Sequence, residues 1–229
     1  NPGTRAKPVE TIQRGVKLAP VGGTVVVRKG VYRETVTLSK KVTLQNYPKE
    51  AFYDLMNIVD SHDTVRAIYK FGGGSDSVAQ PTKKDFDYNL GKARLKLAAT
   101  FLMGYPGMPT IYYGDEAGQY GSSDPDCRRT YPWGKEDKDL IAYYKKVIGV
   151  RNAHKDIFAR GDVNTLKAEG DIYAFSRKAD SGKLGIVALN RGKAQQVILP
   201  VSQAVTGAEL SGETLPLPPF AEAAAALGH

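Results

Sequence analysis

The sequence predicts a mixed α/β and β protein, and three observations support that prediction. Short apolar and β-branched runs separated by glycine turns fill residues 1–50, which indicates a β-rich segment. Residues 51–158 contain two short apolar runs, each with a polar exit and a helical pattern after it, as in parallel strand–helix architectures. Over residues 159–210, further strand patterns alternate with turn residues, which is typical of an antiparallel sheet.

Composition predicts a soluble, globular protein. The 229 residues are long enough for one or two domains with a core, and no run of about eighteen apolar residues predicts a membrane span. The first residues lack the basic and then apolar pattern of a signal peptide. The mature form of a secreted protein has the same features, so the compartment stays open, with an extracellular location favoured.

Charge and cysteine content exclude further classes of function. The formal net charge is +8, and residues 1–50 carry ten Lys or Arg against three Glu. A basic surface attracts polyanions, but no recognition helix, finger or RNP-like pattern accompanies the charge, so no nucleic-acid partner is predicted. Cys127 is the only cysteine, which excludes an internal disulfide and a cysteine-based zinc site. No metal site and no cofactor are predicted.

The first fifty residues predict one short helix and three short strands. Spaced apolar residues at positions 9–18 predict a short helix or helical cap. Residues 24–28 are strongly β-branched and therefore predict a strand. In residues 32–38 and 41–45, apolar and polar residues alternate, which predicts two further strands.

Four runs in this segment resemble the entry coils of right-handed parallel β-helix polysaccharide lyases of the pectate lyase kind. They are residues 8–13, 23–27, 30–34 and 42–48. In that family the opening coils cap the solenoid, while the calcium ligands and the basic catalytic residue come from later coils that have no counterpart in this sequence. Because repeat folds need several stacked units, the resemblance implies that this segment alone neither forms a stable solenoid nor cleaves pectin.

The strand predicted at residues 55–59 ends in the polar cluster most able to bind or react. Its apolar residues predict a largely buried strand, and His62 and Asp63 follow shortly after it. Loops after the carboxyl ends of parallel strands carry functional groups because the scaffold fixes them while ligands can still reach them. The alternative interpretation is a helix-capping loop whose side chains bond to nearby backbone N–H groups.

A helix, a second strand, a long loop and a second helix follow. Residues 87–103 place apolar side chains on one face, which predicts a helix that ends at a glycine-rich turn. Residues 109–113 predict a short strand with a polar exit. The loop carries Asp124 and Arg128, and the helix after it is acidic at its start and basic at Arg151, as the helix dipole favours.

Three motifs of this central part resemble the α-amylase family of glycoside hydrolases, especially its neopullulanase, cyclomaltodextrinase and amylopullulanase members. Residues 60–63 match the end of the seventh barrel strand, residues 104–116 the eighth strand and its exit, and residues 124–129 the loop beyond. The match covers residues 47–158, with the motifs in the right order. It implies that residues 51–158 form the C-terminal part of a (β/α)8 TIM barrel, strands 7 and 8 with their helices.

The same resemblance implies an antiparallel β-sandwich after the barrel, over residues 159–210. Three strand patterns fall within it, at residues 172–178, 184–190 and 195–199. The expected closing strands are not found, so the sandwich is predicted to be truncated. Residues 211–229 are predicted to be a Pro- and Ala-rich tail with a short helix at residues 221–227.

The resemblance also implies roles for individual residues. Members of the family cleave α-glucosidic bonds with retention, using a nucleophilic Asp and an acid Glu about 5 Å apart. A third carboxylate and a histidine hold the sugar hydroxyls. By resemblance, Asp63 is the third carboxylate, a transition-state stabiliser, and His62 is the histidine. Asp124 and Arg128 bind glucose units further from the cleavage point.

Two further residues receive supporting roles. Arg66 follows the predicted sugar-binding pair and is interpreted as a brace for its loop. Trp133 lies beyond Arg128 and is interpreted as a packing residue, in preference to a platform for a sugar ring. Both alternatives for Trp133 stay open at this point.

The catalytic set is incomplete in this sequence. In the family the nucleophilic Asp and the acid Glu end the fourth and fifth strands, upstream of the motif at residue 60, where the β-helix-like segment stands. No Gly-x-Arg-x-Asp pattern and no strand that ends in a Glu precedes His62. Asp115 and Glu116 are interpreted as structural. The chain is therefore predicted to bind an α-glucan oligosaccharide or polysaccharide without cleaving it on its own.

Alternative functions and assemblies stay open. In the first alternative, the chain is the C-terminal part of a hydrolase of starch, pullulan or cyclodextrins. In the second, it is a non-catalytic carbohydrate-binding or structural protein. In the third, it is the remnant of a β-helix pectate lyase. Residues 47–51 fit both the end of the β-helix-like segment and the start of the barrel-like part. We therefore treat a chimeric junction between the two at this pentapeptide as a hypothesis. Because a partial barrel exposes sheet edges, association of identical chains through those edges is a further expectation.

Overall fold

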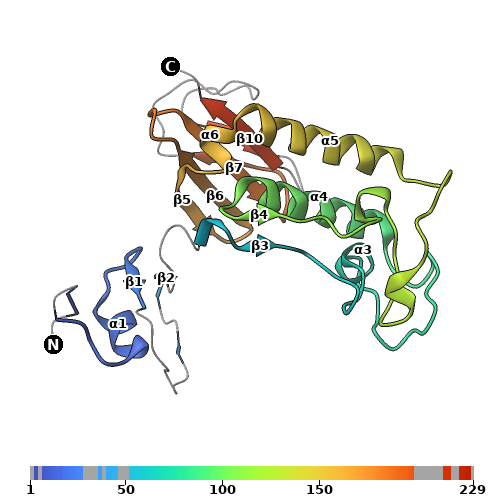
Figure 1. Cartoon of the computed structure of the whole chain (residues 1–229), viewed down its shortest axis with the longest axis horizontal. Coiled ribbons are helices and arrows are strands. Elements are labelled where there is room, and N and C mark those ends of the chain that lie inside the picture. The colour runs from blue at the N-terminus through green and yellow to red at the C-terminus, as the bar shows by residue number, and fades with distance from the viewer. Residues whose placement is uncertain are drawn as a thin grey trace. The chain divides into compact units, whose positions relative to one another are not determined.

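A computed structural model of the chain contains two compact units. The described residues are 3–4, 7–27, 36–37, 40–45, 52–198, 214–217 and 222–227. The first unit is Asn1–Asp54 and the second is Leu55–His229 (Figure 1). Most of the described residues therefore belong to the second unit, which also carries every residue predicted to bind sugar.

In the described part of the first unit, α1 (Ile12–Leu18) is a short helix. The side chain of Thr11 caps it by accepting a hydrogen bond from a backbone N–H of the first turn. The Gln13 side chain exchanges two hydrogen bonds with the backbone of Thr37, at 2.6 and 3.1 Å. The helix predicted at residues 9–18 is confirmed, although it begins only after the Thr11 cap.

Two short strands complete the described part of this unit. β1 (Thr24–Val26) and β2 (Thr43–Gln45) pair in parallel. They confirm the strands predicted at residues 24–28 and 41–45 in part of their length. The strand predicted at residues 32–38 lies largely outside the described residues. One strand pair does not make the stacked coils of a β-helix, and that predicted segment is not shown.

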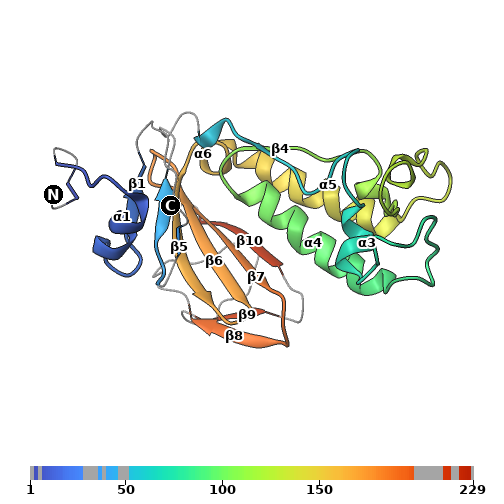
Figure 2. The same ribbon diagram turned by 90° about the horizontal axis from the view of Figure 1, so that it is seen from below.

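Helices dominate the first half of the second unit. α4 (Tyr88–Gly104) and α5 (Lys138–Ala153) run side by side, and the short α3 (Ala67–Phe71) lies at one end of α4 (Figures 1 and 2). Each long helix begins at an aspartate, Asp87 or Asp137, whose carboxylate accepts hydrogen bonds from first-turn N–H groups. Both predicted helices are confirmed.

The core of this half lies where α3, α4 and α5 meet. Tyr69 and Phe86 contact each other edge to face, with their ring centroids 5.0 Å apart. The buried residues of this core are Ala67, Ile68, Tyr69, Phe86, Leu95, Ala99, Leu140 and Tyr144. From α4, Leu95 and Ala99 belong to this core, whereas none of the residues of the predicted apolar face (90, 93, 97 and 101) does, and Phe101 packs against the second core.

Two helical glycines offer a matched pair of substitutions. A Cβ at Gly91 in α4 would lie 2.1 Å from the Ile68 carbonyl oxygen of α3, whereas a Cβ at Gly149 in α5 would meet nothing within 4 Å. Alanine is favoured over glycine in helices by about 1 kcal/mol. We expect Gly149→Ala to stabilise the fold by up to about 1 kcal/mol. We expect Gly91→Ala to destabilise it by about 1–3 kcal/mol, because α3 and α4 must separate.

Urea unfolding curves of both variants measure these changes in the free energy of unfolding. Gly149→Ala is the control, since it introduces the same methyl group into a helix without a steric contact. An equal stabilisation by both substitutions would contradict the close approach of α3 and α4.

The two parallel strands of this half are shorter and more exposed than predicted. β3 (Met56–Asn57) pairs with β4 (Met108–Pro109), and each covers only part of the strand predicted at residues 55–59 or 109–113. The prediction of a largely buried first strand is wrong, because the methionine of each strand is more than half exposed. Among the described residues, no other strand pairs with either one, so neighbouring strands do not cover this apolar surface.

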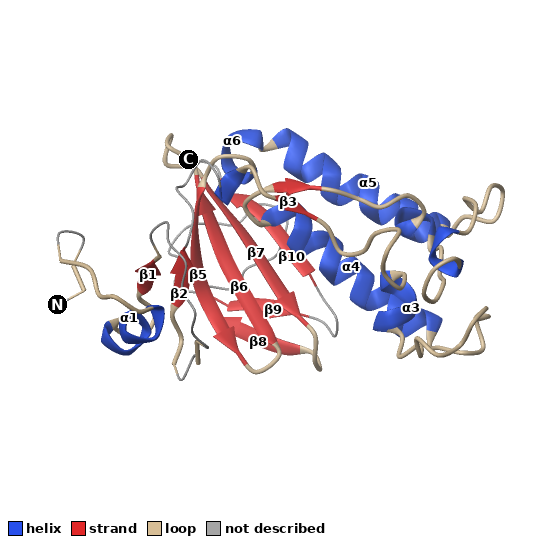
Figure 3. Ribbon diagram, turned by 60° about the horizontal axis from the view of Figure 1, so that its bottom comes forward, coloured by secondary structure: helices blue, strands red, loops and turns tan. Residues whose placement is uncertain are grey.

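The second half of the unit is an antiparallel sheet with the strand order β10-β7-β6-β5 (Figure 3). Its strands are β5 (Asp162–Glu169), β6 (Ile172–Lys178), β7 (Leu184–Asn190) and β10 (Glu222–Leu227). The short helix α6 (Lys155–Phe158) leads from α5 into β5. β6 and β7 confirm two predicted strands, whereas β5 was not predicted.

The C-terminal residues 211–229 contribute strands where a tail was predicted. β8 (Gln195–Ile198), itself a predicted strand, pairs with β9 (Thr214–Leu217), and β10 pairs with β7 along six residues. The short helix predicted at residues 221–227 is wrong. Alanine favours helices locally, but pairing with the backbone of β7 outweighs that weak preference. The prediction that closing strands are absent is wrong for the same reason.

Helix α4 contributes to the core of both halves. Phe101 and Tyr105 stack at 4.7 Å, and both rings meet Phe175 of β6 edge to face, at 6.1 and 5.6 Å. The buried residues of this second core are Ile157, Phe158, Phe175, Ala179 and Val187. Because one helix serves both cores, the helices and the sheet form a single compact unit.

Candidate functional site

A tight turn after β3 presents His62 and Asp63 to solvent. The Ser61 N–H donates to the Thr64 hydroxyl at 2.9 Å, and the Thr64 N–H donates back to the Ser61 carbonyl at 3.2 Å. The Asp63 N–H donates to the Ser61 hydroxyl at 3.2 Å. Hydrogen bonds within the turn thus fix its backbone and do not use the side chains of His62 and Asp63.

All four residues predicted to bind sugar meet around Arg128. Its Nε lies 2.8 Å from Oδ1 of Asp124 and donates to the His62 carbonyl at 3.2 Å, and its Nη2 lies 3.4 Å from Oδ1 of Asp63. Nε2 of His62 lies 3.3 Å from Oδ2 of Asp63. We name His62, Asp63, Asp124 and Arg128 the Arg128 cluster. The peptide bond between Asp124 and Pro125 is cis.

The Arg128 cluster is open to solvent, with side-chain exposures from 45% to 70%. Exposed ion pairs of this kind contribute at most about 1 kcal/mol to stability, because water screens them. The cluster instead presents one guanidinium, two carboxylates and an imidazole, which together can donate to and accept from the hydroxyl groups of a sugar. Its geometry thus suits ligand binding more than fold stabilisation.

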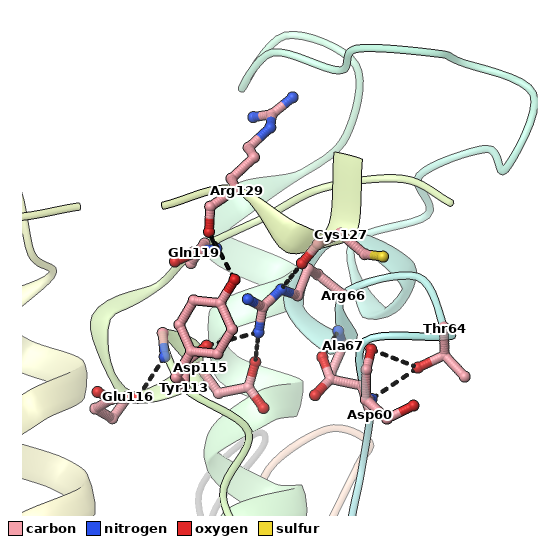
Figure 4. Close-up of polar contacts among 12 residues, drawn as sticks. Asp60, Thr64, Arg66, Ala67, Tyr113, Asp115, Glu116, Gln119, Cys127 and Arg129 are labelled. Carbon is pink, nitrogen blue, oxygen red and sulfur yellow. Dashed lines mark hydrogen bonds and ion pairs between the residues drawn. The ribbon is translucent and has the colours of Figure 1, made fainter. Parts of the chain in front are cut away.

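Arg66 is fully buried and joins three segments (Figure 4). Its Nε donates to the Cys127 carbonyl at 2.7 Å, and its Nη1 donates to the Tyr113 carbonyl at 2.8 Å and lies 3.4 Å from Oδ1 of Asp115. Its guanidinium also lies 4.1 Å from the ring centre of Tyr112. The interpretation of Arg66 as a loop brace accords with these contacts, which also reach beyond its own loop.

Two buried carboxyls lie beside Arg66. Oδ2 of Asp60 accepts a hydrogen bond from the Ala67 N–H at 2.7 Å, which closes the loop that carries His62 and Asp63. Burial raises the pKa of Asp115 well above its ordinary value, the negative charge of Asp60 raises it further, and Arg66 opposes both effects. The neutral form of Asp115 is therefore favoured up to a higher pH in the folded chain than in the unfolded chain.

Comparison with known proteins finds relatives named amylopullulanase, neopullulanase and cyclomaltodextrinase. No protein-family model matches the sequence. An amylopullulanase of Thermoanaerobacter thermohydrosulfuricus is 46% identical over 169 residues, which are 69% of this chain and 11% of that enzyme. Neopullulanase 2 of Thermoactinomyces vulgaris is 35% identical over 179 residues, 73% of this chain and 28% of that enzyme.

A solved cyclomaltodextrinase structure has the same fold over 80% of this chain and 31% of its own, with 33% identity and a TM-score of 0.62. Over most of its length, the chain matches the α-amylase family. The matched part spans less than a third of each of these three relatives. The comparisons give no support to the pectate lyase resemblance of residues 1–50 or to a chimeric sequence.

The buried layer beneath the α-amylase-like loops is the part that sequence reasoning missed. Asp60, Asp115 and Gln119 are buried in it, and the carbonyl of the partly buried Arg129 accepts from the Gln119 amide at 2.6 Å and from the Tyr113 hydroxyl at 2.8 Å. The available signal was a charged residue, Asp60, directly after an apolar run. Polar residues in such positions are buried only when they have partners.

The described residues contain no group of three or more His, Cys, Asp or Glu side chains arranged to hold a metal ion. In the same part of the chain, no helix has both the length and the apolar character needed to cross a membrane.

Replacing Asp115 by asparagine is expected to flatten the pH dependence of stability. The raised pKa means that the folded chain keeps a proton which the unfolded chain releases above a pH of about 4. Stability therefore falls as pH rises from there towards the raised pKa. Asp115→Asn carries no such proton, so its free energy of unfolding relative to the parent should increase with pH. Urea unfolding at several values between about pH 4 and pH 8 measures this difference.

Asp85→Asn serves as the control with the opposite sign. Hydrogen bonds from the backbone and side chain of Thr82 lower the pKa of Asp85. Its contribution to stability is present above the ordinary pKa of about 4 and disappears as pH falls through the lowered one. Relative to the parent, Asp85→Asn should therefore lose stability with rising pH only below about pH 4 and show no change between about pH 4 and pH 8. Parallel pH profiles of Asp115→Asn and the parent would contradict the protonated state of Asp115.

Proposed function

We propose that the second unit forms part of the glucan-binding cleft of a retaining α-glucan hydrolase that acts on starch, pullulan or cyclodextrins. The observation that supports this most is the convergence of His62, Asp63, Asp124 and Arg128 into one exposed cluster. The relatives named amylopullulanase, neopullulanase 2 and cyclomaltodextrinase support the substrate class. In this proposal Arg128 and Asp124 hold one glucose unit, and His62 and Asp63 hold the unit at the cleavage point.

The proposal assigns sugar binding to this chain but not the step that breaks the glycosidic bond. Retaining hydrolysis needs a nucleophilic carboxylate and a carboxylic acid roughly 5 Å apart. Asp63 is the additional carboxylate that holds sugar hydroxyls, and no residue before it matches the nucleophile or the acid of the family. Of the nearby carboxyls, Asp115 is buried against Arg66, and Oε2 of Glu116 accepts a hydrogen bond from the Gly114 N–H at 2.9 Å. Neither is free to act as a nucleophile, which supports a chain that binds glucan without cleaving it.

Calorimetric titration of the whole chain with maltoheptaose tests the binding half of the proposal. We expect Arg128→Ala to weaken binding at least about tenfold, which corresponds to about 1.4 kcal/mol, because it removes the group that holds Asp63 and Asp124 together. Arg191→Ala is the matched control, since Arg191 is also an exposed arginine, 2.8 Å from a carboxylate of Asp171. Equal affinities for the parent and Arg128→Ala would refute the assigned site. Polygalacturonate in place of maltoheptaose tests the lyase alternative.

Release of reducing sugar from pullulan tests the second half of the proposal, that the chain does not cleave glucan on its own. We expect the parent chain to release no more sugar than Asp63→Asn, because the groups that break the bond are missing. Enzymes commonly turn over about 1–1,000 times per second. Turnover by the parent in that range, abolished by Asp63→Asn, would show that carboxylates of this chain complete the catalytic set.

A further inference from the structure

Trp133 has an exposure that its predicted packing role does not explain. Its side chain is 80% exposed, the largest fraction among the exposed large apolar residues in the described part of the chain. Tryptophan is usually well buried because its large apolar surface is costly to leave in water. The interpretation of Trp133 as a packing residue is therefore wrong, and its exposure requires another explanation.

The Trp133 ring is held against a second aromatic ring. Its centre lies 4.5 Å from that of Tyr131, with an angle of 51° between the two planes. Tyr131 is partly buried, and burial followed by the negative charge of Glu116 raises the pKa of its hydroxyl. The pair is therefore held through the more buried Tyr131 ring, while the Trp133 ring remains open to solvent.

The loop that carries the pair is already shaped by its own hydrogen bonds. The Trp133 N–H donates to the Tyr131 carbonyl at 2.9 Å, and the Lys135 N–H donates to the Pro132 carbonyl at 2.9 Å. The Gly134 N–H donates to the Glu136 carboxylate at 3.0 Å. A loop that is ordered before binding loses less conformational entropy when a ligand arrives, which favours binding through a small contact.

We propose that Tyr131 and Trp133 form a platform on which one glucose ring of an α-glucan stacks, outside the Arg128 cluster. One face of a pyranose ring presents C–H groups, which pack against the electron-rich face of an aromatic ring. Lys135 and Glu136 follow the platform and offer a donor and an acceptor to the sugar hydroxyls at its rim. The ligand class rests on the proposed function, whereas the platform itself rests on the exposure and anchoring of the ring.

The platform and the Arg128 cluster lie within reach of one oligosaccharide. Trp133 follows Arg128 by five residues, so their Cα atoms are at most about 18 Å apart even along a fully extended chain. The carbonyl of Arg129 between them is fixed by hydrogen bonds from Tyr113 and Gln119. A glucan held by Arg128 therefore needs only a short extension to contact Trp133, and the second contact raises the overall affinity.

Trp133 is the only tryptophan in the sequence, so tryptophan fluorescence reports on the platform alone. Titration of the whole chain with maltoheptaose should shift the emission to the blue and reduce quenching by acrylamide, in a saturable manner. We expect Trp133→Ala to weaken calorimetric binding of maltoheptaose about threefold to tenfold. Trp133→Phe, which keeps a ring, should retain more of the affinity than Trp133→Ala. Both substitutions are exposed and should leave the fold intact.

The outcomes separate the platform from the proposed function. Arg128-dependent binding heat without any change in the Trp133 emission would overturn the platform and leave the proposed function in place. A fluorescence response that persists in Arg128→Ala, at higher sugar concentration, supports the platform. It does so even if calorimetry finds no role for Arg128 in binding. An emission that shifts with protein concentration in the absence of sugar would overturn the platform, because a second copy of the chain would then cover the ring.

Discussion

Replacing Arg66 by methionine is expected to destabilise the second unit by about 3–5 kcal/mol, which leaves little of the stability of an ordinary domain. The substitution removes the guanidinium that lies 3.4 Å from the buried Asp115 carboxyl and deprives the Cys127 and Tyr113 carbonyls of their donor. A buried charge that loses its partner is far more costly than the intact pair is stabilising. Urea unfolding followed by circular dichroism measures the loss.

Arg66→Lys separates charge from geometry in this prediction. Lysine keeps the positive charge but lacks the planar fork that reaches two carbonyls and a carboxylate at once, so an intermediate loss is expected. Because the pKa of Asp115 is raised and lower pH favours its neutral form, the methionine variant should regain part of its deficit as pH falls. If the free energy of unfolding of the methionine variant lies within about 1 kcal/mol of the parent value at neutral pH, Arg66 does not hold together the segments that carry the site.

Replacing Arg177 by methionine is expected to cost about 2–4 kcal/mol by loosening the contact between α4 and the sheet. Arg177 is fully buried, and its guanidinium donates to the Gly104 carbonyl at 2.7 Å and to the Gly161 carbonyl at 3.0 and 2.8 Å. The Gly104 carbonyl is one of the last in α4, so Arg177 satisfies a helix end that the helix itself cannot. Without the arginine, these carbonyls are left buried without this donor.

Arg160→Met is the control for this second prediction. Arg160 is exposed and close in sequence to the Gly161 carbonyl that Arg177 binds, so its replacement should change stability by less than about 0.5 kcal/mol. The free energies of unfolding of the two variants, taken from urea curves, give the comparison. Equal effects of the two substitutions would refute a specific role for the buried arginine.

The elements that depend on local signals could be predicted from the sequence. The long helices α4 and α5 combine an apolar stripe with an aspartate at the N-cap, and both cause helix formation within a few residues of the chain. The strands β6 and β7 are bounded by turn residues that act equally locally. In each case the residues that determine the element lie inside it or next to it.

Elements that depend on distant partners could not be predicted in this way. β10 has the composition of a helix and becomes a strand only because β7 has an edge to pair with. β3 has the composition of a buried strand but pairs only with β4 among the described residues, so its apolar residues stay exposed. Local preference amounts to a few tenths of a kcal/mol per residue, which pairing and packing readily outweigh.

The candidate site likewise combines residues that local motifs predict with contacts that depend on distant partners. Motifs identified His62 with Asp63, and Asp124 with Arg128, as two separate pairs. Their contact depends on Arg66, which brings the two loops together through the Cys127 carbonyl, 61 residues further along the chain. No local pattern in the sequence specifies that contact, which explains why Arg66 received only a minor role and the buried Asp115 only a structural one.

Amide mapping by two-dimensional NMR most directly tests the claim that the Arg128 cluster is a glucan-binding site. Maltoheptaose is added to the isotope-labelled whole chain, and the shift of every assigned backbone amide is followed. We predict saturable shifts concentrated in residues 60–64 and 124–129, and their loss in Arg128→Ala. Saturable shifts that leave both loops unchanged, or that persist in full in Arg128→Ala, would contradict the account.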